Sequence, residues 1–500
     1  MGGMPPKLPR AAWSAVPLAG LLYFYRLGAA GLVGPDEPRY ASIGREMARS
    51  GDWITPRLWG QPWFEKPALL YWMEALAFRL GLGPEMAPRL PVATLAVAFL
   101  AFYWWILRRE FGGRAAGMAT LILGTSGAWI VASQIGVTDL PLAATFSAAM
   151  LLALPWIARR DSALLPLAAA LLGLAVLAKG LVPVVLAFPL FWRGAAWRDL
   201  FRPRVALPFL AVCLPWYVLC YLRNGRSFLV EFFWQHHFER MVSPALMHVQ
   251  PWWFYLPVLL ASLLPWTPLL VLLGGRAAYR DSRRIFLLAW LLFGLAFFSV
   301  ATNKLPGYLL PLLPAAAALM GLALAEAAGA RGWLALSAGL LVIFPMAVPI
   351  LPAAVADGLS HAPRPAFDWT WLLPAGLAAV VWALDMRSRR MAAVLAIAAG
   401  AVAGIVYVKY AAMPALDRTA SARSLWREVE NRAALTCAAR INRNWRYGLN
   451  YYSVDPLPEC SEDPRPWWIR QVSGERPSVD PAPPPTAPPD HRLTPSHAAL

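Results

Sequence analysis

Charged residues are scarce in this chain. Asp, Glu, Lys and Arg make up 15% of its 500 residues, whereas hydrophobic residues make up 59%. This balance excludes an ordinary water-soluble domain and predicts a polytopic membrane protein. The 25 Trp residues suit the two interfaces of a bilayer, where amphipathic rings gather.

Three further absences narrow the class of protein. No repeat of 20 to 50 residues is evident, and neither are the repeated halves typical of many transporters. The first apolar stretch is too long for a cleavable signal peptide and lacks an Ala-x-Ala site. Although the net charge is +17, the basic residues are dispersed over many loops rather than gathered on one face, which argues against nucleic-acid binding.

Long apolar stretches account for most of the chain up to residue 410. Most are close to the roughly 20 residues that a spanning helix needs. Thirteen such stretches are at residues 11–32, 88–107, 115–133, 139–157, 163–178, 180–192, 204–222, 251–273, 284–301, 305–325, 332–351, 369–384 and 391–409. Lys179 and Pro183 divide 164–192 into two short segments, and merging these would give twelve spans.

The charge of the loops favours thirteen spans, because Lys and Arg prefer the cytoplasmic side of short loops. With thirteen, the basic clusters fall on one side: Lys7 and Arg10; Arg108, Arg109 and Arg114; Arg159 and Arg160; Arg193, Arg198, Arg202 and Arg204; Arg276, Arg280, Arg283 and Arg284; Arg387, Arg389 and Arg390. This pattern predicts a cytoplasmic N-terminus. It places Asp36, Asp139, the 223–250 loop, Lys304 and the C-terminus outside.

The loop after the first span carries an unusual group of polar residues beside the membrane. In Gly34-Pro35-Asp36-Glu37-Pro38-Arg39-Tyr40, the proline suits the first position of a helix. Asp36 would then lie just ahead of that helix, with Arg39 and Tyr40 in its first turn. Charged groups are retained beside a bilayer mainly for function, which makes this loop the expected site of chemistry.

The same outer loop, residues 34–87, continues to a second predicted helix from Pro67 to Leu80, preceded by Glu65-Lys66. The apolar residues of this helix suit the membrane interface. Lys66 and Arg39 would then lie at headgroup depth, where they could bind a lipid phosphate. Anchoring charges or surface ion pairs are the alternative interpretation.

Two later segments supply further polar groups on the same side. Asp139 begins a span in Thr138-Asp139-Leu140-Pro141, where it could act in catalysis or simply cap the helix. Lys304-Leu305-Pro306-Gly307-Tyr308 offers a cation and a hydroxyl to an anionic ligand.

The 223–250 loop contains His236 and His237 with Glu231 and Glu239. Adjacent histidines diverge on a helix and no third ligand follows at a standard spacing, so no metal site is assigned, although a divalent metal remains possible. Arg240 is the better candidate there, as a phosphate contact. Lys179 could be a snorkelling anchor or part of a lipid pathway.

The composition changes after residue 410. Residues 417–434 predict an amphipathic helix capped by Asp417, Thr419 or Ser421, followed by strands at 435–441, 447–453 and 467–472. The chain therefore divides into a membrane domain (1–410), a small outer domain (411–472) and a Pro-rich tail (473–500) expected to be disordered. Cys437 and Cys460 lie in the outer compartment and are predicted to form a disulfide, the alternative being two free thiols.

Taken in order, Asp36-Glu37-Pro38-Arg39-Tyr40, Glu65-Lys66-Pro67, Thr138-Asp139 and Lys304-Leu305-Pro306-Gly307-Tyr308 resemble the bacterial lipid A aminoarabinose transferases and the related protein O-mannosyltransferases. The resemblance covers residues 11–410. It implies the all-α GT-C fold, with about thirteen membrane helices and a periplasmic site in the bacterial inner membrane. The small outer domain is expected to be α/β.

The resemblance also implies roles for the candidate residues. Asp36, Glu37 and Asp139 are the catalytic candidates, and the phosphate-binding candidates are Arg39, Tyr40, Lys66, Arg240, Lys304 and Tyr308. The implied reaction moves a sugar, such as 4-amino-4-deoxy-L-arabinose, from undecaprenyl phosphate to a lipid A phosphate. A protein hydroxyl or another glycan is the alternative acceptor, and a lipid or sugar transporter is a remote alternative. The sequence predicts no definite cofactor, and the protein is expected to be a monomer.

Overall fold

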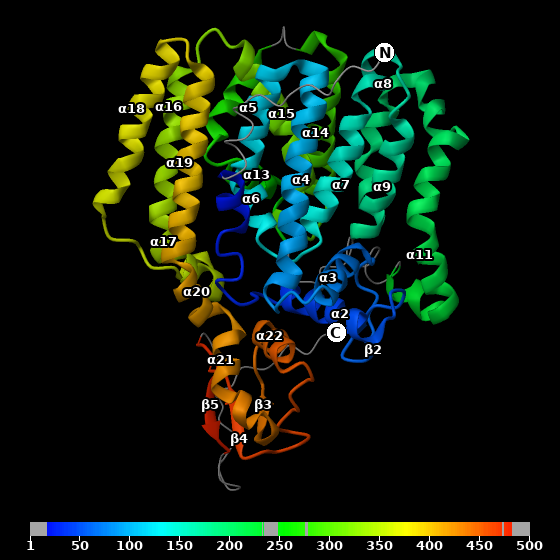
Figure 1. Cartoon of the computed structure of the whole chain (residues 1–500), viewed down its shortest axis with the longest axis vertical. Helices are drawn as coiled ribbons and strands as arrows, with labels where there is room; N and C mark the ends of the chain where they lie inside the picture. Colours follow the sequence, from blue (N-terminus) through cyan, green and yellow to red (C-terminus); the bar gives the residue numbers. More distant parts are fainter. Residues whose placement is uncertain (1–17, 233, 235–248, 276–278, 473–474, 483–500) are drawn as a thin grey trace.

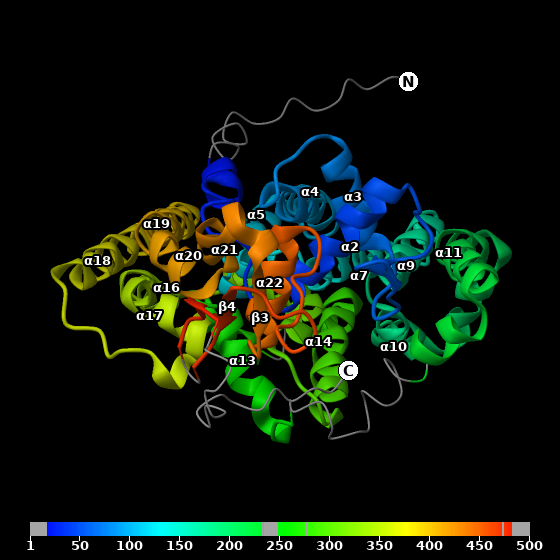
Figure 2. The ribbon, with the colours of Figure 1, turned by 90° about the horizontal axis from the view of Figure 1, so that it is seen from below.

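The computed structural model describes residues 18–232, 234, 249–275, 279–472 and 475–482. Long helices run side by side in a bundle, and a small C-terminal domain projects from one end (Figure 1). The loop segment with residues 36–79 lies across that same end. When the molecule is viewed along the bundle, the C-terminal domain covers part of this segment (Figure 2). The chain is therefore a multi-pass membrane protein. Its outer loop segment and its C-terminal domain lie at the same end of the helical bundle.

Eight helical segments in the described ranges are long and apolar enough to cross a bilayer. They are Met86–Phe111, Asp139–Arg159, Pro203–Phe232, Ser282–Val300, Pro306–Glu326, Arg331–Asp357, Trp369–Met386 and Arg390–Ala411. Two helix pairs join them if each is one bent span: Gly113–Gly124 with Gly127–Ser133, bent by 61°, and Trp252–Ser262 with Thr267–Gly274, bent by 110°.

The predicted number of thirteen spans stays a prediction. The first expected span, 11–32, begins in residues that the structure does not describe. The two short stretches between residues 163 and 192 are separate apolar helices, Leu165–Lys179 and Val182–Phe191, each shorter than a full crossing. The break falls at Gly180, whose φ of +73° is readily adopted only by glycine.

Individual elements are labelled as in Figure 1, with η for 3₁₀ or π turns. The bundle contains η1 (Gly20–Phe24), α4 (Met86–Phe111), α5 (Gly113–Gly124), α6 (Gly127–Ser133), α7 (Asp139–Leu152), α8 (Leu154–Arg159), α9 (Leu165–Lys179), α10 (Val182–Leu186), η2 (Phe188–Phe201), α11 (Pro203–Leu229), η5 (Trp252–Phe254), α13 (Tyr255–Ser262), η6 (Thr267–Gly274), α14 (Ser282–Val300), η8 (Pro306–Leu312), α15 (Leu313–Glu326), α16 (Arg331–Gly339), η9 (Leu340–Val342), α17 (Ile343–Asp357), η10 (Leu359–His361), η11 (Trp369–Leu372), α18 (Leu373–Met386) and α19 (Arg390–Ala411).

Helix α7 is the buried centre of the bundle. It packs against α4, α9 and η8, and almost every residue after Asp139 is buried. A helix that is apolar all round is stable only where neighbours surround it. The position of α7 therefore places Asp139, its first residue, at the end of the bundle where the outer loop lies.

The first outer loop contains two helices and a hairpin: α2 (Asp36–Ser50), β1 (Arg57–Leu58), β2 (Gln61–Pro62) and α3 (Leu69–Arg79). Helix α2 buries Tyr40, Ile43 and Met47 against α3. Helix α3 lies where the sequence predicts an interfacial helix. Both helices lie across the end of the bundle (Figures 1 and 2), and the Gly136 N–H just before α7 donates to Glu37 in α2.

The C-terminal domain contains α20 (Met413–Ala420), α21 (Ala422–Val429), η12 (Glu430–Leu435), β3 (Thr436–Ala439), α22 (Arg443–Ser453), β4 (Trp467–Arg470) and β5 (Ser478–Pro481). Its sheet has the order β3-β4-β5, with β3 parallel and β5 antiparallel to β4. Cys437 and Cys460 form a disulfide, as predicted.

Three expectations for this domain are wrong. The helix expected at 417–434 is not continuous: Ser421, one of its three predicted caps, does cap α21 by accepting from the Arg423 N–H, but α20 precedes it and α21 ends at Val429. Residues 447–453 belong to helix α22 rather than a strand, because the Asn442 side chain caps that helix. Part of the expected disordered tail is strand β5, paired with β4. The remainder, 483–500, lies outside the described residues.

Candidate functional site

Arg39 is the centre of the first polar cluster. It lies one turn into α2, so its guanidinium folds back toward Asp36, with an Nη2 to Oδ1 distance of 2.6 Å. The same nitrogen lies 2.8 Å from Oε2 of Glu65 in the loop before α3. Asp36 is half exposed, with 48% of its side chain accessible, whereas Arg39 and Glu65 are largely buried. One oxygen-bearing side chain of the cluster is therefore open to an approaching substrate.

Lys66 joins this cluster through Glu65. Its Nζ lies 3.0 Å from Oε1 of Glu65, while Arg39 binds the other oxygen of the same carboxylate. Glu65 thus holds two cations next to each other that would otherwise repel. The structure brings together Asp36, Arg39 and Lys66, as the sequence predicts, and adds Glu65 as the group that spaces them.

The environment of Arg39 keeps it charged and leaves one donor available. Burial alone would lower its pKa, but the negative charges of Glu65 and Asp36 raise the pKa above its ordinary value. Its Nε–H is buried and has no hydrogen-bond partner among the described residues. A buried donor of this kind is costly unless a ligand completes it.

Glu37, a catalytic candidate, has a different environment from its neighbour Asp36. It is buried, and Nε and Nη2 of Arg89 in α4 bind its two oxygens at 2.6 and 2.8 Å. The backbone N–H groups of Val33 and Gly136 also donate to it. With both oxygens so occupied, Glu37 is placed to fix the loop rather than to touch a substrate.

A second cluster forms where α7, α9 and η8 meet. Lys179, the last residue of α9, donates to Oδ1 of Asp139 at 2.6 Å and lies 4.8 Å from the centre of the Tyr308 ring. A Cβ at Gly307 would lie 2.9 Å from the same Asp139 oxygen, so only glycine lets η8 come this close. Asp139 and Tyr308 are therefore neighbours, and the hydrogen bond from Gly136 to Glu37 connects their loop to α2.

The remaining phosphate-binding candidates have more varied positions. Lys304 is buried, and its Nζ donates to the carbonyls of Gln250 and Ala301, which ties two loops together. Tyr40 is buried with its ring 5.3 Å from the Arg39 guanidinium, and burial together with Glu65 raises the pKa of its hydroxyl. Their binding of phosphate stays a prediction. Arg240 lies outside the described residues.

Metal ligands are not gathered in the part of the chain that the structure describes: no three His, Cys, Asp or Glu side chains come together there in a way that could hold an ion. The histidine pair of the 223–250 loop, His236 and His237, lies outside that part. The described clusters offer cations to an anion and carboxylates to a sugar or an acceptor. These groups can bind an anion, accept a proton or stabilise a positive charge.

Three residues that build the site, Glu65, Lys179 and Arg89, are absent from the catalytic and phosphate-binding residues that the sequence predicts. Glu65 was visible beside Lys66, but nothing in the sequence indicated that it would bridge two cations. Lys179 stood out as a charge between two apolar stretches, without a partner that could be named. Arg89 occupies the first turn of a spanning helix, and such a charge beside a bilayer is a signal in itself.

Glu74 in α3 is a buried carboxyl close to the Glu37 and Arg89 pair. Neither of its oxygens has a hydrogen-bond partner in the described structure. Burial and the negative charge of Glu37 both raise its pKa well above the ordinary value. Gly44 and Gly136 pack directly against it, so this buried carboxyl is part of the contact between α2, α3 and the loop before α7.

Glu74→Gln is expected to stabilise the protein in a pH-dependent way. An acid whose pKa is raised by folding loses stability as pH rises from its unfolded value, about 4.3, toward its folded value. Glutamine has no such loss, so the melting midpoint in detergent should rise by about 1 to 3 °C at pH 8 and hardly at all near pH 4.5. Glu46→Gln, at the surface beside Gly60, is the control. Equal shifts of the melting midpoint at both pH values would contradict a raised pKa at Glu74.

Comparisons with known proteins relate the sequence to lipid-linked sugar transferases. The profile of the dolichyl-phosphate-mannose-protein mannosyltransferase family matches residues 14–258. An undecaprenyl phosphate-alpha-4-amino-4-deoxy-L-arabinose arabinosyl transferase of Pseudomonas aeruginosa (strain UCBPP-PA14) is 36% identical over 335 residues, covering 63% of this chain and 60% of the relative. The protein of the same name from Edwardsiella ictaluri is 33% identical, covering 62% and 59%. The matches thus span about three fifths of the curated relatives.

Solved structures extend the likeness to nearly the whole chain. ArnT from Cupriavidus metallidurans, bound to undecaprenyl phosphate, is 27% identical with a TM-score of 0.72, covering 90% of this chain and 86% of that one. The apo oligosaccharyltransferase of Archaeoglobus fulgidus, at 14% identity and a TM-score of 0.51, shares the fold alone. In sequence and in fold this chain is therefore similar to the aminoarabinose transferases, and it resembles the solved ArnT structure in its helical bundle, its outer loop and its small C-terminal domain.

Proposed function

We propose that this protein is a glycosyltransferase that moves 4-amino-4-deoxy-L-arabinose from undecaprenyl phosphate to a phosphate of lipid A. The observation that carries the proposal is the pair of cations, Arg39 and Lys66, held side by side by Glu65 at the end of the bundle. This arrangement suits a lipid phosphate at headgroup depth. The likeness to ArnT bound to undecaprenyl phosphate supports the same ligand class.

The donor phosphate would gain charge during the reaction. The bond between the anomeric carbon and the phosphate oxygen breaks, the electron pair stays with undecaprenyl phosphate, and an acceptor oxygen forms the new bond to the same carbon. Fixed positive groups that face this growing charge lower the barrier without having to reorganise. Arg39, through its unpartnered Nε–H, and Lys66 would supply the positive charge, and the neutral Tyr308 hydroxyl would donate a hydrogen bond.

Asp36 would act on the other side of the sugar. A phosphate acceptor is already nucleophilic, so Asp36 would orient it or stabilise positive charge developing on the sugar. A hydroxyl acceptor would need Asp36 as general base. A single displacement inverts the anomeric centre and needs no covalent sugar on the enzyme. Intact-mass detection of a glycosyl adduct on Asp36 would contradict this route.

The second candidate acceptor is a protein hydroxyl, and the match of residues 14–258 to the protein mannosyltransferase family favours it. A transporter fits less well. Coupling charges of secondary transporters lie near the middle of the bilayer on broken helices. Here the two polar clusters lie at one end of the bundle, at the starts of α2 and α7.

The proposed setting is the bacterial inner membrane, with the N-terminus in the cytoplasm and the site and C-terminal domain in the periplasm. The basic loops support this orientation: Arg108 and Arg109 end α4 and Arg159 ends α8, at the end opposite Asp36 and Asp139. The disulfide Cys437–Cys460 also suits an oxidising compartment. We propose that the protein acts as a monomer, with the undecaprenyl-phosphate-linked sugar as donor and lipid A as acceptor.

Mass spectra of lipid A test the acceptor. A deletion strain should lack one phosphate-linked aminopentose unit, and the wild-type gene should restore it. An amino sugar would mask phosphate charge, so the deletion should also raise sensitivity to cationic peptides such as polymyxin. Identical lipid A spectra in deletion and restored strains would reject lipid A as acceptor and direct attention to proteins or other glycans.

A further inference from the structure

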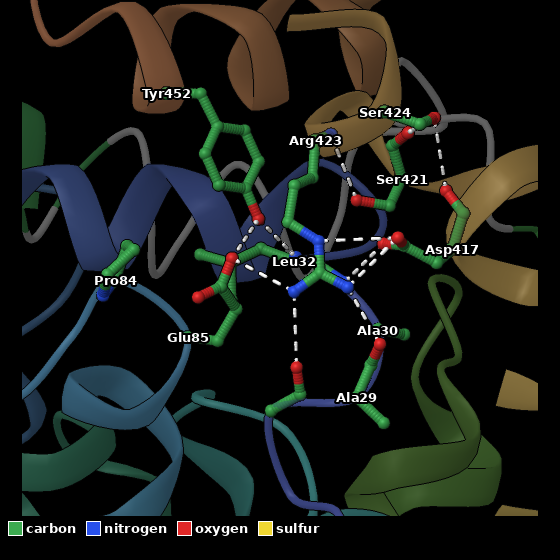
Figure 3. Close-up of polar contacts among 12 residues, drawn as sticks. Ala29, Ala30, Leu32, Pro84, Glu85, Asp417, Ser421, Arg423, Ser424 and Tyr452 are labelled. Atoms are coloured by element: carbon green, nitrogen blue, oxygen red, sulfur yellow. Dashed lines mark hydrogen bonds and ion pairs between the residues drawn. The ribbon is translucent and has the colours of Figure 1, made fainter. Parts of the chain in front are cut away.

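The C-terminal domain forms hydrogen bonds with the chain segment that lies just before Asp36. Arg423, near the start of α21, donates to the carbonyls of Gly28 and Ala29 at 3.1 and 2.7 Å (Figure 3). Its guanidinium is held in turn by Asp417 at 2.9 Å and by Glu85 at 3.2 Å. One arginine therefore joins the C-terminal domain, the segment that leads to α2 and the start of α4.

Asp417 and a further side chain of the same domain, Tyr452, bind the next residues of that segment. The Gly31 N–H donates to Asp417 at 2.7 Å, and the Leu32 N–H donates to the hydroxyl of Tyr452 at 3.0 Å. The Tyr452 hydroxyl donates to Glu85 at 3.3 Å (Figure 3). Backbone groups of Gly28, Ala29, Gly31 and Leu32 are thus held by the C-terminal domain, the last of them four residues ahead of Asp36.

Helix α22 lies on α2 and presents aromatic rings to it. Tyr447 and Tyr451 are four residues apart, so they share one face of α22. The Arg39 guanidinium lies 5.3 Å from the Tyr447 ring centre, and that of Arg45 lies 4.4 Å from the Tyr451 ring centre. Tyr451 also donates to the carbonyl of Pro84 at 2.6 Å. Tyr451 therefore docks the helix, while Tyr447 reaches the proposed phosphate-binding arginine.

The Tyr447 ring is itself held in place. Trp59 stacks on it, with ring centres 5.6 Å apart and an interplanar angle of 25°. Trp59 has a φ of +55°, a conformation that is rare for a bulky residue, in the tight turn between β1 and β2. Two other rings near Arg39, those of Tyr40 and Trp63, come from the first loop, whereas Tyr447 comes from a separate domain.

We propose that Tyr447 is a positioning residue of the donor site, so that the C-terminal domain completes this site. The face of its ring would hold the Arg39 guanidinium in the plane that directs the unpartnered Nε–H toward the donor phosphate. The inference rests on the proposed function, because it takes undecaprenyl phosphate as the ligand of Arg39. It adds to that function a residue from outside the membrane domain.

Binding of undecaprenyl phosphate to the purified full-length protein in detergent tests the proposal. Tyr447→Phe keeps the ring and should bind within about twofold of wild type. Tyr447→Leu removes the ring face and should weaken binding about five- to thirtyfold, the range for a desolvated cation–π contact. Tyr451→Leu is the matched control on the same helix face. It removes a docking contact away from Arg39 and should leave binding near wild type, even if the melting midpoint falls.

Four outcomes would overturn the inference. Binding by Tyr447→Leu that equals wild type would show that the ring does nothing for the site. Equal losses in Tyr447→Phe and Tyr447→Leu would remove the ring face as the cause. An equal loss in Tyr451→Leu would reduce the effect to loosening of the domain. Wild-type protein that does not bind undecaprenyl phosphate would overturn the proposed donor itself, and the inference with it.

Discussion

Asp36→Asn is expected to lower the rate of sugar transfer about 10²- to 10⁴-fold, the usual contribution of a positioned acid or base. Asparagine keeps the size of the side chain and can still accept from Arg39, so the fold should persist. It lacks the negative charge that would orient an acceptor, stabilise the sugar or take a proton. Transfer from undecaprenyl-phosphate-linked aminoarabinose to lipid A by the purified enzyme is the measurement.

Glu37→Gln is the matched control for this prediction, since it makes the same chemical change one residue later. Glu37 is buried between Arg89 and two backbone N–H groups, so its loss of charge should lower the melting midpoint. The two variants therefore separate a chemical role from a structural one. Near-normal turnover of Asp36→Asn enzyme would refute both roles proposed for Asp36.

Arg39→Ala is expected to lower kcat about 10²- to 10³-fold, as the loss of one well-placed donor to a developing anion does. Removal of Arg39 also takes one positive charge away from the side of the Glu65 carboxylate, which makes the site less attractive to the phosphate. Arg39→Lys should recover only part of the rate, because an ammonium keeps the charge but not the planar donor edge. Initial rates over a range of donor concentrations would separate kcat from KM.

Arg57→Ala is the control for Arg39→Ala. Arg57 is in the same outer loop, is more exposed and donates to the carbonyl of Gly60 at the hairpin. A purely electrostatic attraction of the loop for anionic lipid would be reduced similarly in both variants. A rate loss in Arg57→Ala that matches that in Arg39→Ala would count against a specific donor role for Arg39.

Local patterns in the sequence predicted the parts of the site that depend on one segment. Pro38 predicted a helix start next to Asp36 and Arg39, and the structure places these two side chains 2.6 Å apart, although α2 begins two residues earlier, at Asp36 itself. The apolar run after Pro67 predicted α3, and the compartment predicted the Cys437–Cys460 pair. Each of these predictions depends on the properties of a short segment or of the residues themselves, which can be read directly from the sequence.

Contacts between distant segments could not be predicted in the same way. Nothing near Glu37 in the sequence indicates Arg89, 52 residues away, and nothing near Lys179 indicates Asp139, 40 residues away. The run 447–453 has the aromatic residues of a strand, yet the Asn442 cap and the packing of α22 on α21 and α2 select a helix. Tertiary contacts override propensity in such short segments.

The hydrogen bonds from Arg89 to the outer loop affect how deep the proposed site lies relative to the lipid bilayer. Arg89 lies in the first turn of α4, and it binds the carbonyls of Leu27, Ala30 and Gly31 as well as Glu37. A spanning helix adjusts to a thicker or thinner bilayer by tilting. Because the loop is bound to α4 itself, such a tilt would carry Asp36 along with the helix, so the depth of the proposed site would follow the thickness of the membrane around it.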